Sequence, residues 1–219
     1  MTHKHLFFDC FGTLIDTEQS SLRATKKMLS ELAPDIDPVV FYKQWKAMNG
    51  DACYLPFRTE AEAFLENFNQ LMALYGESAR VDSIDYLRHE MINRKPFGDA
   101  LEVIKRLSRV AKVYVASNSD HYPLECCLEP FVPYLSGIYS SEQFQTYKPQ
   151  AGFFHSMLEE SQVEASDSFY IGDSIINDVV APERLGIRSY LIDRTSSEHG
   201  LGWPSLSDFA DEIVRRLAP

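Results

Sequence analysis

Leu6-Phe7-Phe8-Asp9-Cys10-Phe11-Gly12 stands near the start of the chain, where three apolar residues lead into an aspartate and a glycine. A short apolar run followed by turn-forming residues is typical of a buried strand that ends in a loop. Similar apolar runs recur at 113–116, 137–139, 169–171 and 189–192. Because these runs are continuously apolar and do not alternate, they predict strands covered on both faces, as in a parallel sheet.

Helical patterns lie between and after the predicted strands, at 101–107, 153–158 and 206–217. Alternation of strands and helices predicts a doubly wound, Rossmann-like α/β core with a parallel sheet. The chain has 219 residues, which is enough for such a core and a smaller insert.

A long segment without a strand pattern separates the first predicted strand from the second. Its clearest helix begins at Thr59-Glu60-Ala61-Glu62, a capping box, and is expected to stop at Gly76. A single crossover helix needs far less chain than this. The sequence therefore predicts an α/β core domain at 1–15 and 96–219, and an inserted all-helical cap domain at 16–95.

Composition limits the partners. The formal net charge of −11 disfavours non-specific binding to nucleic acid or to anionic membranes, which reward positive charge. No apolar run approaches the ~20 residues that a membrane span requires. The four cysteines show no C-x-x-C spacing, and the first five residues lead directly into a short strand. We expect a cytoplasmic monomer or homodimer without disulfides, acting on a small molecule and not on nucleic acid or membrane.

Polar residues follow three of the predicted strands. Asp9 and Thr13 follow the first, Ser117 and Asn118 follow the second, and Asp173 follows the fourth. Each has an ordinary explanation by itself, because such residues often cap turns and helices. Ligands of parallel α/β sheets bind at the carboxyl ends of the strands. These side chains are therefore expected to converge on one rim.

The ordered motifs resemble those of the haloacid dehalogenase superfamily. In sequence order they are Phe8-Asp9-Cys10-Phe11-Gly12-Thr13-Leu14-Ile15-Asp16, Ala116-Ser117-Asn118, Tyr147-Lys148-Pro149 and Ile171-Gly172-Asp173-Ser174-Ile175-Ile176-Asn177-Asp178. Each motif is short, but the ordered set covers nearly the whole chain and is specific. The helical insert after the first motif resembles the C1-type cap of that family. The resemblance implies a hydrolase.

The resemblance also implies roles for the motif residues. The implied catalytic residues are Asp9, Thr13, Ser117, Asn118 and Lys148, and the implied Mg²⁺ ligands are Asp9, Asp173 and Asp178. Asp9 would be the nucleophile, forming an aspartyl intermediate that is then hydrolysed. Thr13 and Ser117 would hydrogen-bond the oxygens of the bound group, and Lys148 would supply positive charge there.

Two positions favour different reactions within the family. Phe11 stands where phosphatases carry an aspartate that protonates the leaving group, whereas dehalogenases have an aromatic residue there. Asp173 stands at a position where dehalogenases typically have an uncharged residue, and dehalogenases bind no metal there. Three carboxylates in one cleft would repel one another without a cation, so Asp173 favours a metal site. The sequence therefore predicts Mg²⁺-dependent hydrolysis of a small phosphorylated metabolite with a good leaving group.

Other functions stay open. The main alternative is metal-independent dehalogenation of a 2-haloacid, with Trp45, Tyr54, Phe57 and Arg58 available from the cap. Phe11 and Arg58 are the predicted substrate-binding residues. A phosphonatase-like cleavage of a carbon–phosphorus bond would need Lys43 or Lys46 to form a Schiff base. A binding module without catalysis is disfavoured, because every other motif residue is intact.

Overall fold

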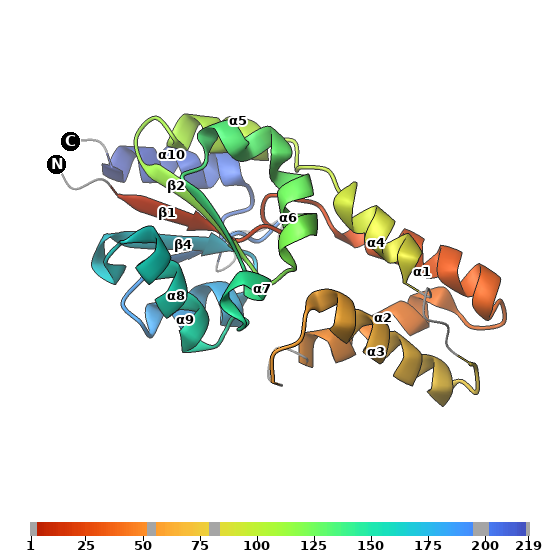
Figure 1. Ribbon diagram of the computed structural model, residues 1–219. Coiled ribbons are helices and arrows are strands. Elements are labelled where there is room, and N and C mark those ends of the chain that lie inside the picture. The colour runs from red at the N-terminus through yellow and green to blue at the C-terminus, as the bar shows by residue number, and fades with distance from the viewer. Residues whose placement is uncertain (1–3, 52–55, 79–83, 195–201, 218–219) are drawn as a thin grey trace.

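Five parallel strands form a single central sheet (Figure 1), in the order β3-β2-β1-β4-β5. The strands are β1 (His5–Phe8), β2 (Lys112–Ser117), β3 (Gly137–Ser140), β4 (Ser168–Gly172) and β5 (Arg188–Leu191). The computed structural model describes residues 4–51, 56–78, 84–194 and 202–217. All five predicted strands are present, each within one or two residues of its expected bounds. The order places β1, and the loop that follows it, in the centre of the sheet.

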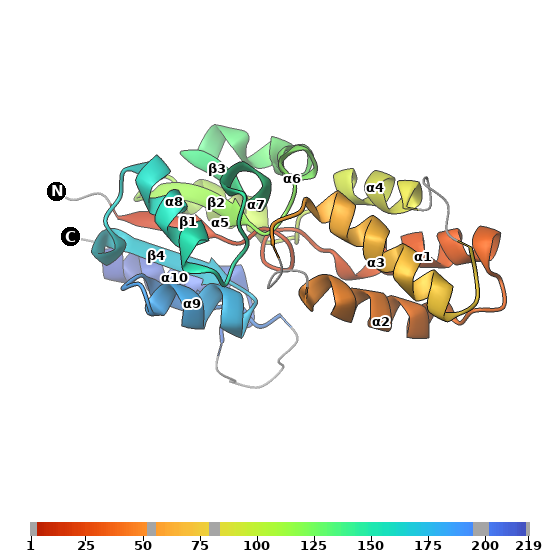
Figure 2. The same cartoon turned by 60° about the horizontal axis from the view of Figure 1, so that its bottom comes forward.

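Helices cover both faces of this sheet (Figures 1 and 2). They are α5 (Ala100–Leu107), α6 (His121–Leu128), α7 (Ser141–Phe144), α8 (Ala151–Ser161), α9 (Ala181–Glu183) and α10 (Leu206–Leu217), with 3₁₀ turns η2 (Glu129–Tyr134) and η3 (Ala165–Asp167) and a π-helical segment η4 (Ile175–Val180). The neighbouring residues Phe7 and Phe8 show how the two layers arise. Phe8 packs with Ile104 and Phe209 on one face, and Phe7 packs with Phe154 on the other. The predicted doubly wound α/β core is confirmed.

A group of four helices lies beyond one end of the sheet (Figure 2). These are α1 (Glu18–Leu32), α2 (Pro38–Asp51), α3 (Glu60–Leu74) and α4 (Asp85–Ile92), and the described residues between 16 and 95 contain no strand. Their apolar faces enclose a core of their own, in which Trp45 and Phe68 are almost completely buried. The capping box is present, because the Thr59 side chain accepts from the Glu62 N–H and the Glu62 carboxylate accepts from the Thr59 N–H.

Two short backbone segments connect the helical group to the sheet. Ile15 pairs with Pro96 in an isolated antiparallel bridge. The Asp16 N–H donates to the Lys95 carbonyl at 3.0 Å, and the Phe97 N–H donates to the Leu14 carbonyl at 2.9 Å. The outgoing and returning chains are therefore tied together where the two predicted domains would meet. The division at 16 and 95 stays a prediction, and these paired residues are the place where a hinge would lie.

Among the described residues, no helix has both the length and the apolar composition that crossing a membrane would require.

Candidate active site

Asp9 lies directly after β1, at the carboxyl end of the central strand. Its N–H donates to the carbonyl of Ile171 in β4 at 2.8 Å, so the residue continues the sheet ladder by one step. Ser117 ends the neighbouring strand β2, and Gly172 ends β4 on the other side. The central position of β1 thus places Asp9 between the polar ends of two other strands, as expected for a ligand site in such a sheet.

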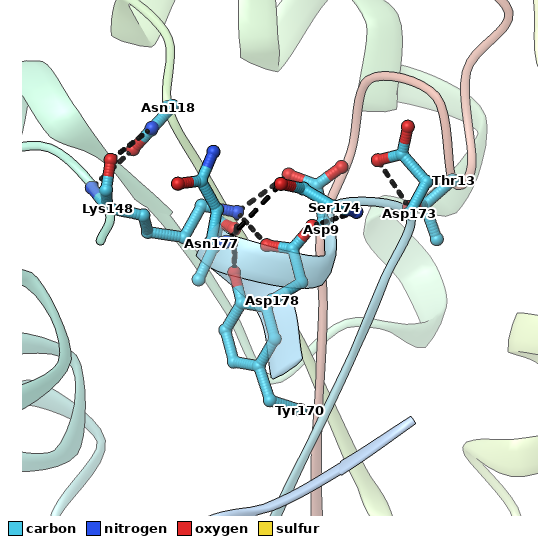
Figure 3. Close-up of polar contacts among 10 residues, drawn as sticks. Asp9, Thr13, Asn118, Lys148, Tyr170, Asp173, Ser174, Asn177 and Asp178 are labelled. Atoms are coloured by element: carbon cyan, nitrogen blue, oxygen red, sulfur yellow. Dashed lines mark hydrogen bonds and ion pairs between the residues drawn. The ribbon is translucent and has the colours of Figure 1, made fainter. Parts of the chain in front are cut away.

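Lys148 reaches into the site from one side and binds the carboxylates of Asp9 and Asp178 (Figure 3). Its ammonium donates to Asp9 Oδ1 at 2.8 Å, to Asp178 Oδ1 at 2.7 Å and to the Tyr170 hydroxyl at 2.9 Å. The Tyr170 hydroxyl in turn donates to the carbonyl of Ala116 at 2.6 Å. Lys148 is only 1% exposed. All three of its protons are therefore used inside the protein, and the lysine is fixed in place.

The cluster of charged side chains at the strand ends carries more negative than positive charge. Three carboxylates, those of Asp9, Asp173 and Asp178, face one ammonium, that of Lys148, which leaves a net charge of −2 when all are ionised. Burial raises the pKa of Asp9 to about 7, Lys148 opposes this shift, and the neighbouring Asp178 and Asp173 add to it. Partial desolvation at the site and the neighbouring Asp178 likewise raise the pKa of Asp173, although its side chain is exposed. In both cases desolvation is the largest cause, and repulsion from the neighbouring carboxylates adds to it.

The three carboxylates can hold a metal ion. One oxygen from each of Asp9, Asp173 and Asp178 lies within 4.8 Å of the others. Asp9 Oδ2 is buried and has no hydrogen-bond partner, so a ligand atom is free where a cation would lie. Asp178 is held through both carboxylate oxygens, because Oδ1 accepts from Lys148 and Oδ2 accepts from the Ser174 N–H at 3.0 Å. Mg²⁺ prefers oxygen ligands and needs only one or two carboxylates. The donor set therefore fits a divalent cation of this kind.

Two glycines make room for these carboxylates. A Cβ on Gly12 would lie 2.3 Å from Asp173 Oδ2, and a Cβ on Gly172 would lie 2.4 Å from Asp178 Cγ. Gly12 also has a φ of +103°, which side chains other than glycine rarely adopt. The turn after β1 thus depends on glycine for its backbone conformation and for the position of Asp173.

The substitution Gly12→Ala is expected to damage both features. The strained backbone should lower the free energy of unfolding by about 1–3 kcal/mol, and displacement of Asp173 should weaken Mg²⁺ binding at least tenfold. Chemical denaturation and titration calorimetry measure these effects. A Cβ added to Gly50 in α2 would meet no other atom within 4 Å, so Gly50→Ala is the matched control and should stabilise slightly. Equal behaviour of the two variants would contradict this account of the turn.

The other predicted residues occupy different parts of the site. Ser117, Asn118 and Phe11 line the cavity above Asp9. Asn118 also exchanges two hydrogen bonds with the backbone of Lys148, at 2.7 and 2.8 Å, which fixes the loop that carries the lysine. Thr13 is fully buried and contacts Asp173 Oδ1 at 3.4 Å.

Arg58 is held near the loop of Lys148 by its backbone, because its carbonyl accepts from the Tyr147 hydroxyl at 2.7 Å. It pairs with Glu66, and it is not among the residues that line the cavity. Its role in substrate binding stays a prediction.

The cap residues considered for dehalogenation and for Schiff-base chemistry lie in different places, and only some of them line the cavity. Trp45 belongs to the cap core, with its indole N–H donating to the Phe64 carbonyl, and also reaches the cavity. Phe57 stacks on Tyr147, with ring centroids 5.2 Å apart. Lys46 lines the cavity, whereas Lys43 is not among its lining residues. Tyr54 lies outside the described residues.

A cavity of about 340 Å³ lies between the sheet end and the cap helices, a size suited to a small metabolite. Three residues that sequence reasoning missed contribute here. Arg94 and Glu60 line it from the cap side, and Tyr170 supports Lys148 beneath it. The Arg94 guanidinium lies 5.0 Å from the centre of the Phe11 ring. No local motif marks these positions, because an arginine in a connecting loop, a glutamate in a first helical turn and a tyrosine in a buried strand are all common.

Comparison with known proteins identifies the class of protein to which this site belongs. The family model of the haloacid dehalogenase-like hydrolases matches residues 3–186, and the chain belongs to this family of hydrolases. A curated relative, haloacid dehalogenase-like hydrolase domain-containing protein 3 of Danio rerio, is 31% identical over 109 residues, which are 48% of this chain and 45% of the relative. The protein of the same name from Xenopus laevis is 32% identical over 68 residues, 31% of this chain and 27% of the relative. The matches thus span less than half the length of these curated relatives.

Solved structures agree on the fold. The HAD hydrolase YfnB from Bacillus subtilis, determined bound to magnesium, superposes with a TM-score of 0.83 at 18% identity, covering 97% of this chain and 99% of that one. The L-2-haloacid dehalogenase from Xanthobacter autotrophicus gives a TM-score of 0.82 at 16% identity, with 99% and 100% coverage. At these identities the likeness establishes a shared fold, and the reaction has to be argued from the site.

Proposed function

We propose that this hydrolase removes the phosphoryl group from a small phosphorylated metabolite with Mg²⁺ as cofactor. The observation that carries the proposal is Asp173, which joins Asp9 and Asp178 to make three carboxylates around the Lys148 ammonium at the strand ends. A metal-free reaction at Asp9 would require this nucleophile to be ionised among uncompensated negative charges. A divalent cation compensates the net charge of −2.

Asp9 is the nucleophile in this proposal. Its carboxylate oxygen attacks phosphorus, and the bond from phosphorus to the leaving oxygen breaks with its electron pair going to that oxygen. Water then attacks the phosphorus of the aspartyl phosphate. The bond between phosphorus and the Asp9 oxygen breaks, which gives phosphate and the free Asp9 carboxylate. When bound, Mg²⁺ would be held by Asp9, Asp173 and Asp178 and would offset charge on the phosphoryl oxygens.

Protein groups orient the phosphoryl group. Lys148 keeps Asp9 Oδ1 in place through a 2.8 Å contact, which leaves Oδ2 free. The side chains of Ser117 and Asn118 border the same space and can donate to the non-bridging oxygens. The buried Thr13 hydroxyl donates to Asp173 Oδ1 at 3.4 Å and so helps to position this carboxylate. Phe11 cannot donate a proton, so the first motif by itself suits good leaving groups such as aryl and acyl phosphates.

Two alternative reactions are each supported by a separate observation. Dehalogenation of a 2-haloacid is favoured by Phe11 and by the dehalogenase structures among the fold neighbours. A phosphonatase-like reaction is favoured by Lys46, whose position on the cavity wall would allow a Schiff base with a carbonyl substrate.

A comparison of substrate classes tests the proposal. We expect phosphate release from p-nitrophenyl phosphate and acetyl phosphate with Mg²⁺, and loss of this activity in EDTA. Phosphonoacetaldehyde and 2-chloropropionate should react at least about 100-fold more slowly, because the site would not stabilise their transition states. Halide release in EDTA would instead establish a dehalogenase, and release from phosphonoacetaldehyde that Lys46→Arg abolishes would establish the Schiff-base reaction.

A further inference from the structure

Glu60 is an acidic residue of the cavity that the reaction described above does not use. It is the first residue of α3, and it lines the same cavity as Asp9 and Phe11 from the cap side. One carboxyl oxygen of Glu60, Oε2, is buried and has no hydrogen-bond partner. The residue as a whole is half-buried. An ionised carboxylate with a buried, unpartnered oxygen is costly, so this environment favours the neutral carboxylic acid.

The backbone of Glu60 is held by the core. The N–H groups of Glu60 and Ala61 donate to the two carboxylate oxygens of Asp120, at 2.6 and 2.9 Å. Asp120 lies three residues after Ser117, the last residue of β2, so the loop that follows Ser117 and carries Asn118 also anchors α3. The start of α3 and the end of β2 are therefore fixed against each other across the cavity.

The charges around Glu60 agree with a neutral acid. Burial raises the pKa of Glu60 to about 8, the carboxylate of Asp120 adds to the shift, and Arg94 opposes it. The other charged groups on the cavity wall are Lys46, Asp9, Lys148, Asp173 and Asp178. A raised pKa means that the folded protein keeps the proton at pH 7 and loses it as the pH rises through about 8. No ion pair with Arg94 occurs among the described contacts of Glu60.

We propose that Glu60 supplies the proton to the leaving group. Phe11 cannot fill this role, because a phenyl ring has no proton to donate. The inference rests on the proposed phosphoryl hydrolysis. As the bond from phosphorus to the leaving oxygen breaks, that oxygen keeps the electron pair and takes the proton of the Glu60 carboxyl. The alcohol departs, and Glu60 is left as a carboxylate facing the aspartyl phosphate.

The same residue can assist the second step. An in-line displacement at phosphorus requires water to enter on the side from which the leaving group departed, opposite Asp9. The Glu60 carboxylate takes a proton from this water as the water oxygen bonds to phosphorus, and the bond between phosphorus and Asp9 breaks. Phosphate and the Asp9 carboxylate result, and the Glu60 carboxyl is restored. The substrate class then extends from aryl and acyl phosphates to alkyl phosphates, which the first motif alone would disfavour.

The substitution Glu60→Gln tests this role, because glutamine has nearly the same shape and no acidic proton. For an alkyl phosphate such as glycerol phosphate, kcat/KM should fall about 10²- to 10⁴-fold, the usual contribution of general acid catalysis. For p-nitrophenyl phosphate, kcat/KM should change less than about threefold, since nitrophenolate leaves without a proton. The second step loses its base with either substrate, so a rapid burst of nitrophenolate should precede a slow steady state, and phosphorylated Asp9 should accumulate.

The pH profile and a control separate this role from a structural one. In the wild type, kcat/KM for glycerol phosphate should decrease above pH ~8, and this decrease should vanish in Glu60→Gln. Glu77, exposed and three residues beyond the end of α3, provides the matched control, and Glu77→Gln should behave as wild type. The thermal midpoint of each variant reports whether it is folded.

The outcomes distinguish this inference from the proposed function. If folded Glu60→Gln lowers kcat/KM equally for both substrates, or leaves glycerol phosphate turnover intact, Glu60 is not the proton donor, although phosphate release by the wild type still supports the proposed function. If the wild type releases phosphate from neither substrate with Mg²⁺, the proposed function fails together with this inference.

Discussion

Asp9→Asn is expected to lower kcat by about 10⁵-fold or more, the scale of loss seen when a covalent nucleophile is removed. The amide keeps the size of the side chain but cannot form the aspartyl phosphate. The fold should persist, since Asp178 and Tyr170 still accept from Lys148. Steady-state assays at saturating Mg²⁺ with p-nitrophenyl phosphate measure the loss.

The stability of the same variant provides a second readout. Burial and two neighbouring carboxylates raise the pKa of Asp9 to about 7. A raised carboxyl pKa means that the charged form destabilises the folded protein, and that this destabilisation is greatest above pH 7. In the absence of metal at pH 8, Asp9→Asn should therefore unfold at the same temperature as the wild type or a higher one. A folded Asp9→Asn protein with more than about one hundredth of wild-type turnover would contradict nucleophilic attack by Asp9.

Removal of the metal is expected to have the second largest effect. In EDTA the hydrolysis of p-nitrophenyl phosphate should fall at least about 10³-fold, because a bound metal contributes several kcal/mol to the stabilisation of transition-state charge. Added Mg²⁺ should restore it. Asp173→Asn should weaken Mg²⁺ binding at least about 100-fold, since even the outer partners of metal ligands contribute about 10- to 100-fold.

Unfolding experiments test the metal site independently of catalysis. Mg²⁺ at about 100 times its Kd should raise the free energy of unfolding of the wild type by about 2.7 kcal/mol. Asp173→Asn should show almost none of this increase at the same Mg²⁺ concentration. Asp35→Asn, which changes an exposed carboxylate outside the cavity lining, is the matched control and should keep it. Full activity in EDTA, or equal stabilisation of all three proteins, would contradict the metal site.

The sequence was sufficient for the sheet and the main polar cluster because both depend on local signals. Each strand is a short run of apolar residues, and the ordering rule for parallel sheets brings their carboxyl ends together. Asp9, Ser117 and Asp173 could therefore be assigned to one rim before any coordinates. The start of α3 was also predictable, because Thr59 and Glu62 form a capping box from neighbouring residues.

The cap side of the cavity could not be predicted in this way. Glu60 is next to the capping residue, and a glutamate in a first helical turn is ordinarily explained by the helix dipole. The burial of its Oε2 atom depends on how α3 packs against the loop of Asp120, 60 residues further along the chain. Tyr170 and Arg94 acquire their positions in the same non-local manner. The motif assigned Lys148 to the bound group, whereas in the structure its ammonium pairs with Asp9 and Asp178.

The covalent step at Asp9 is the central claim, and acid-quench mass spectrometry tests it most directly. The wild type and Glu60→Gln are mixed with acetyl phosphate and Mg²⁺, quenched within the first turnover and digested. The account predicts one phosphoryl group on the peptide that contains Asp9, no such group in Asp9→Asn, and greater accumulation in Glu60→Gln if Glu60 activates the water. Phosphate release by the wild type with no phosphorylated Asp9 at any quench time, in either protein, would contradict it.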